Sequence, residues 1–162
     1  MARLLLFADV RSRVAALDAL LDAAKRGGDE PVCLGNLAEP GPGAQDTLEL
    51  ARRKGVMLVA GPLDKALLKE PVGIERAEVA WLRNAAAPRR LVAGGRAMLL
   101  TSDPAAQAPS FVVRPGAATR IAERHAELGP VAESRGEAAC LRLDLETGAL
   151  DARRVAWDQT AR

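Results

Sequence analysis

The stretch "LLLFADVRSRVAALDALLDAA", from Leu4 to Ala24, decides the fold class. Its first residues form an apolar run typical of a buried strand, and after Ser12, which could cap a helix, apolar residues recur at helical spacing. Asp9 follows the strand and Arg11 comes two residues later, so on an extended chain both side chains point to the same side. Ligands in open α/β sheets are held at this end of the strands. The stretch therefore predicts a strand and helix unit with a candidate site at Asp9 and Arg11.

Two further strands and a helix follow at regular spacing. The segments Pro31 to Gly35 and Val56 to Gly61 are short apolar runs typical of buried strands, and Asp46 to Lys54 has the pattern of a helix. Strands that alternate with helices pair in parallel through right-handed crossovers, so their C-terminal ends lie at one edge of the sheet. This edge would carry four polar residues: Asp9, Arg11, Asn36 and Asp64.

The second half of the chain has a different pattern. A helix is predicted from Glu75 to Asn84, and the sequence then indicates two hairpins. The first, "RLVAGGRAMLLTSD", turns at Gly94 and Gly95, the kind of residue pair that a tight hairpin prefers. The second joins "AACLRLDL" to "ALDARRVAW" through "ETG". We therefore expect one α/β domain over residues 1–162.

Composition restricts the cellular setting and the partners. The formal net charge is only +2, and the chain has no tyrosine, so it lacks the basic surface and the stacking aromatic residues that nucleic-acid binding favours. Cys33 and Cys140 lie in apolar runs and are expected in the core. No apolar run approaches the ~20 residues of a membrane span, and Asp9 and Arg11 interrupt the N-terminal one. We expect a cytoplasmic protein without membrane insertion and without a nucleic-acid partner.

The order of these elements, together with the residues at the strand ends, resembles the calcineurin-like metallophosphoesterase superfamily in its compact bacterial phosphodiesterase branch. The resemblance is good from Met1 to Asp103, moderate from Ala138 to Trp157 and poor between them. It implies a sandwich of mixed β-sheets flanked by helices, trimmed in its second half around Ala105 to Pro109. In that family the motifs D-x-H, G-D, G-N-H-D or G-N-H-E, a lone histidine and G-H-x-H hold two metal ions that activate water.

Most of those ligands are replaced in this sequence. In "DVR" Asp9 stands but Arg11 takes the place of the histidine, and in "CLGNL" Asn36 replaces the bridging aspartate. In "AGPLD" Asp64 remains, whereas Pro62 and Leu63 replace asparagine and histidine. Thr101 stands where the family has its lone histidine. The resemblance thus implies a degenerate former metal site made of Asp9, Arg11, Asn36, Pro62, Leu63, Asp64 and Thr101.

The position of G-H-x-H has two alternatives. Either Ala117 and Thr119 stand for the two histidines, or the strand that carries them is missing; the short stretch after Thr101 favours the second. His125 is the one histidine of the chain and lies in a polar, helical-looking run, where a solvated surface position is expected. We therefore expect no bound manganese, zinc or iron and no other cofactor.

The chemistry of arginine gives Arg11 a different role from a ligand. A guanidinium stays protonated and has no lone pair for a metal, so Arg11 either pairs with Asp9 as a replacement counter-charge or points to solvent. Three functions remain open. The first is a catalytically inactive pseudoenzyme, hence not an enzyme, that acts as a scaffold for a protein partner through an apolar patch at residues 36–45 or 66–74. The second is a metal-free sensor of a phosphorylated small molecule or nucleotide, with Arg11, Asn36 and Arg114 as anion contacts. The third is a residual phosphoesterase.

Overall fold

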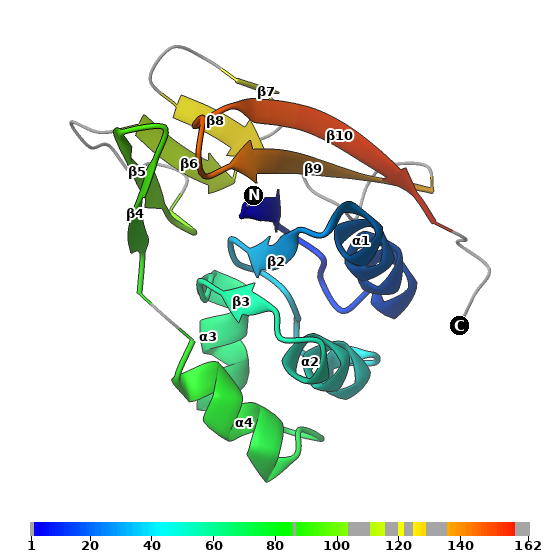
Figure 1. Cartoon of the computed structure of the whole chain (residues 1–162). Coiled ribbons are helices and arrows are strands. Elements are labelled where there is room, and N and C mark those ends of the chain that lie inside the picture. Colours follow the sequence, from blue (N-terminus) through cyan, green and yellow to red (C-terminus); the bar gives the residue numbers. More distant parts are fainter. Residues whose placement is uncertain are drawn as a thin grey trace.

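Two five-stranded sheets and four helices make up the computed structural model (Figure 1). It describes residues 2–85, 87–103, 111–115, 120–121, 125–128 and 136–157. The first sheet has the strand order β10-β9-β1-β2-β3 and the second has the order β4-β5-β6-β8-β7. The predicted α/β sandwich of mixed sheets flanked by helices is therefore confirmed.

The first sheet is parallel at its centre and antiparallel on one side. Its strands are β1 (Arg3–Phe7), β2 (Glu30–Cys33), β3 (Met57–Leu58), β9 (Glu137–Asp144) and β10 (Leu150–Ala156). β1 pairs in parallel with β2, and β2 with β3, whereas β9 runs antiparallel to β1 and β10 antiparallel to β9. Because β1, β2 and β3 share one direction, their C-terminal ends meet at a common edge, as the alternating pattern predicts.

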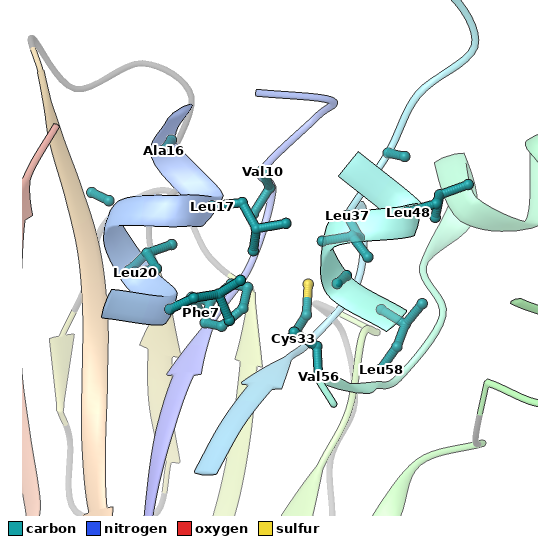
Figure 2. Close-up of a cluster of buried hydrophobic side chains, with 14 of the residues drawn as sticks. Phe7, Val10, Ala16, Leu17, Leu20, Cys33, Leu37, Leu48, Val56 and Leu58 are labelled. Atoms are coloured by element: carbon teal, nitrogen blue, oxygen red, sulfur yellow. The ribbon is translucent and has the colours of Figure 1, made fainter. Parts of the chain in front are cut away.

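Helices cover one face of the first sheet. They are α1 (Val14–Gly27), α2 (Ala44–Arg53), α3 (Pro62–Lys69) and α4 (Arg76–Arg83). Figure 2 shows the core between α1, α2 and this face, with Phe7 of β1 and Cys33 of β2 directed toward Leu17 of α1. All three side chains are fully buried, so α1 is fixed against the sheet by its apolar stripe.

The other face of the first sheet packs on the second sheet. The second sheet consists of β4 (Arg89–Ala93), β5 (Arg96–Leu100), β6 (Phe111–Pro115), β7 (Arg120–Ile121) and β8 (His125–Leu128). Leu4 and Leu6 of β1 alternate with the helix-facing residues and join Leu100 and Val113 of the second sheet in a separate buried cluster. β1 is thus buried on both faces, which explains its uninterrupted apolar sequence.

Both predicted hairpins are present. Gly94 and Gly95 connect β4 to β5 with φ values of 56° and 72°, the left-handed region that a two-residue turn of this kind requires. β9 and β10 form the second hairpin. Among the described residues, no helix is long and apolar enough to cross a membrane.

Three local features differ from what the sequence indicated. Pro62–Lys69 forms a helix that the sequence analysis did not identify. Residues 125–128 form strand β8 and not a helical turn, because β6 supplies a parallel partner for their backbone. Ser12 does not cap α1: its Oγ accepts a hydrogen bond from Glu39 N, and Arg13 stands at the start of the helix without a side-chain cap. The predicted trimming at Ala105 to Pro109 lies outside the described residues.

Candidate functional site

The loops after β1 and β2 run side by side at the C-terminal edge of the parallel strands. Asp9 N donates to Gly35 O at 3.0 Å and Arg11 N donates to Asn36 O at 3.0 Å. Asp9, Arg11 and Asn36 have φ values of 57°, 52° and 54°. This left-handed backbone replaces the extended chain on which the sequence analysis placed Asp9 and Arg11, so that prediction of their geometry is wrong, although the two residues remain neighbours.

Asp9 and Asn36 form the centre of the edge. The Nδ2 of Asn36 donates to Oδ1 of Asp9 at 2.7 Å, and the backbone N of Leu63 donates to Oδ1 of Asn36 at 3.1 Å. Asp9 is buried and only 7% exposed. The amide of Asn36 therefore fixes the Asp9 carboxylate and connects the ends of β1 and β2 with the start of α3.

Asp64 holds the start of α3 rather than facing solvent. It is fully buried; its Oδ2 accepts a hydrogen bond from Gly61 N at 2.8 Å and its Oδ1 accepts one from Ala38 N at 3.1 Å. Burial raises the pKa of the Asp64 carboxyl from 3.8 to about 6, although the backbone donors act in the opposite direction. Pro62 occupies the first turn of the same helix, where its missing N–H is tolerated.

Arg11 is the exposed cation of the edge. Its Nε lies 3.9 Å from Oδ1 of Asp9, and its side chain is 42% exposed. This long contact is weaker than the 2.7 Å hydrogen bond that the same oxygen accepts from Asn36. The guanidinium therefore lies near the strand ends with a large part of the side chain exposed.

Two glycines and a serine that the sequence analysis did not single out pack tightly at the base of the edge. A Cβ on Gly35 would lie 2.8 Å from the Cβ of Ser102, and a Cβ on Gly61 would lie 2.7 Å from Asn36 N. Ser102 Oγ donates to Ala60 O at 3.0 Å and so connects the end of β5 with the end of β3. The signal available in the sequence was a glycine directly after each of two apolar strands.

Thr101 and Arg114, two further residues singled out in the sequence, lie in different surroundings. Thr101 is buried beside Ser102, and its Oγ1 accepts a hydrogen bond from Asp103 N at 3.1 Å. Arg114 lies on β6, where its neighbour Val113 faces the core between the sheets, so the Arg114 side chain leaves from the opposite face. There its NH2 group is 3.1 Å from Oε1 of Glu127. The structure thus groups Arg114 with Glu127 and not with Arg11.

The described part of the edge does not fit a dinuclear metal centre. Across the described residues, no group of three or more histidine, cysteine, aspartate or glutamate side chains could hold a metal ion. Both oxygens of Asp64 accept backbone hydrogen bonds, and the Asp9 carboxylate is shared between Asn36 and the positive charge of Arg11. Two carboxylates that are already engaged in these contacts are too few ligands for two cations. Positions 117 and 119 lie outside the described residues.

Comparisons with known proteins give the fold. Neither a protein-family model nor a curated protein matches the chain. Hypothetical protein PH1004 from Pyrococcus horikoshii OT3 is 14% identical, with a TM-score of 0.73 over 98% of this chain and 90% of that one. A protein described as a putative diadenosine tetraphosphatase is 17% identical, with a TM-score of 0.68 over 97% and 95%. The protein TT1561 of Thermus thermophilus is 12% identical, with a TM-score of 0.59 over 94% and 98%.

These similarities confirm a metallophosphoesterase-like fold. They also contradict the expectation that the chain is not an enzyme, because a protein with this fold over nearly the whole chain is described as a putative diadenosine tetraphosphatase. The expectation depended on replaced residues at the strand ends. Those replacements bear on metal ligation, and they do not by themselves decide whether a protein of this fold is an enzyme.

Proposed function

We propose that this metallophosphoesterase-like chain binds a phosphorylated small molecule at the edge formed by Asp9, Arg11 and Asn36. The observation that supports the proposal is the state of Arg11, an exposed guanidinium whose one polar side-chain contact within the described residues is the 3.9 Å approach to Asp9 at the strand ends. A guanidinium presents a planar set of donors that matches phosphate oxygens, and hydrogen bonds between two charged groups are the strong ones.

The burial of the charged groups also favours an anionic ligand. The Asp9 side chain is 10% exposed, whereas the Arg11 side chain is 42% exposed, so an approaching ligand meets the cation first. One hydrogen of the Asn36 amide is used by Asp9. The second hydrogen of that amide is a further donor at the same edge.

Hydrolysis of the bound phosphoester is a second candidate function. This candidate is supported by the similarity in fold to the protein described as a putative diadenosine tetraphosphatase. The assay below reads binding and hydrolysis separately.

The scaffold for a protein partner stays a prediction. Of the segment at 66–74, Leu67 is buried and Leu68 and Ile74 pack on the core, which leaves Val72 exposed at 87%. The other large exposed apolar residues of the described chain are Val92 and Ile121, on opposite edge strands of the second sheet. These side chains are scattered and do not form the contiguous patch that a docking surface presents.

Calorimetric titration with ADP and with diadenosine tetraphosphate tests the proposal. Arg11→Gln removes the charge but keeps a polar side chain of similar length, and it should weaken binding about tenfold through loss of one charge-assisted hydrogen bond. The control variant Arg83→Gln changes an exposed arginine in the last turn of α4 and should leave the affinity unchanged. Chromatography of the titrated nucleotide detects hydrolysis. Equal affinity of the wild type and Arg11→Gln, or no binding of either nucleotide, would refute the proposal.

A further inference from the structure

A region rich in arginine lies away from the strand ends. A hollow of about 340 Å³ opens between the last turns of α1 and the α1-facing side of β9 and β10. Its lining includes four arginines: Arg26, Arg142, Arg153 and Arg154. It shares no residue with the edge formed by Asp9, Arg11 and Asn36.

The strand register explains why two of these side chains, those of Arg142 and Arg153, lie on the same face of the sheet. Cys140 of β9 is directly opposite Arg153 of β10, and Arg142 is opposite Asp151. Directly opposite residues of an antiparallel pair share a face of the sheet. Cys140 belongs to the core beneath α1, so Arg142 and Arg153 leave from the same face, toward the end of α1 where Arg26 stands.

The charges around the hollow are not balanced within it. Arg142 pairs with Asp29 at 2.7 Å, Arg153 with Asp151 at 2.5 Å, and Arg154 with Glu137 at 3.1 Å. None of these carboxylates lines the hollow. Arg26 is exposed, and its side chain makes no ion pair or hydrogen bond with any residue that the structure describes. An anion in the hollow would therefore meet the Arg26 side chain and three guanidinium groups that each already have a carboxylate partner outside the lining.

The rest of the lining is apolar. Leu5, Cys140 and Val155 lie between the arginines. Burial raises the pKa of the Cys140 thiol to about 11, so the thiol stays neutral near pH 7 and adds no negative charge to the floor. A volume of about 340 Å³ is at the small end of the range for small-molecule pockets, which favours a compact ligand over a macromolecule.

We infer that this hollow is a second binding site, distinct from the strand-end edge, for an organic phosphate of nucleotide size. Its phosphate groups contact Arg26 and Arg153, and its uncharged part covers the apolar floor beside Val155. Arginine suits both contacts, because a guanidinium binds phosphate through several donors and stacks on planar groups.

The test separates this site from the strand-end edge. ADP is titrated into Arg11→Gln protein, in which the anion contact of the edge is removed, and into the same protein with Arg26→Gln added. Binding should persist in Arg11→Gln and weaken about tenfold in the double variant. The matched control is Arg11→Gln with Arg83→Gln, since Arg83 also stands in the last turn of a helix and is exposed. Circular dichroism checks that each variant is folded.

Each result has one meaning. ADP binding that Arg11→Gln abolishes supports the edge and refutes the hollow. If Arg11→Gln leaves ADP binding unchanged and Arg26→Gln weakens it, the result supports binding in the hollow and refutes binding at the strand-end edge. Affinity unchanged by Arg26→Gln overturns the inference. If pyrophosphate binds as tightly as ADP, the inferred contact between the organic part of the ligand and the apolar floor is refuted.

Discussion

Replacing Asp64 by asparagine should remove a specific pH dependence of stability. The Asp64 carboxyl is fully buried, and burial raises its pKa from 3.8 to about 6. At about 1.36 kcal/mol per pKa unit, this difference corresponds to roughly 3 kcal/mol between the stabilities of the protein with Asp64 protonated and ionised. The single side-chain oxygen of asparagine can accept a hydrogen bond from either Gly61 N or Ala38 N. The other backbone N–H then faces the NH2 group of the asparagine and loses its hydrogen bond, which costs about 1–3 kcal/mol of folding stability.

The sign follows from the direction of the shift. Because the folded-state pKa is raised, the contribution of Asp64 is fully present below its unfolded value of 3.8 and is lost as the pH rises through about 6. The free energy of unfolding of the wild type, relative to Asp64→Asn, should therefore fall by roughly 2 kcal/mol between about pH 4 and pH 7, which is most of the full difference. Groups that titrate equally in both proteins cancel in this difference.

Urea unfolding of both proteins, followed by circular dichroism at intervals from pH 4 to pH 7, measures that difference. Similar m-values in the two proteins would show that the same surface is exposed on unfolding. A difference that stays flat with pH, or one in which the wild type gains stability relative to Asp64→Asn as the pH rises, would show that burial does not raise the pKa of Asp64.

Three further predictions concern the core, an ion-pair cluster and metals. Leu17→Ala empties a fully buried position between α1 and the sheet and should cost about 2–5 kcal/mol in urea unfolding, whereas a cost below about 1 kcal/mol would argue against the packing in Figure 2. Arg142→Gln leaves the fully buried Asp29 side chain with Arg3 as its remaining cation and should cost about 1–3 kcal/mol in the same assay; an unchanged midpoint would contradict it. Dialysis against EDTA should leave Tm unchanged, because the described edge lacks a metal-ligand set; a Tm lowered by several degrees would count against this.

The first half of the fold follows from local sequence patterns. The apolar runs at β1 and β2 and the stripes of α1 and α2 are visible in short windows, and parallel pairing places their ends at one edge. The helix Pro62–Lys69 was missed, although α4, which has the same length, was predicted. β8 was missed because its backbone partners come from β6, and no local pattern contains that pairing.

The sequence indicated which residues meet at the strand ends better than it indicated how their backbones are arranged. The parallel arrangement correctly grouped Asp9, Arg11, Asn36 and Asp64 at one edge. The left-handed backbone at Asp9 and Arg11 depends on hydrogen bonds to the loop after β2, so their sequence spacing could not indicate it. Asp64 has a helix-start role because α3 begins at Pro62.

Backbone amide chemical shifts recorded during an ADP titration would locate the ligand at the proposed binding edge residue by residue. The measurement uses the Arg26→Gln variant, in which ADP binding in the hollow beside α1 is weakened. We expect saturable shifts of the amides of Arg11, Asn36 and Leu63, which belong to the hydrogen-bonded strand ends. A titration that saturates while these three amides stay unchanged, or an absence of saturable shifts throughout the spectrum, would contradict binding at this edge.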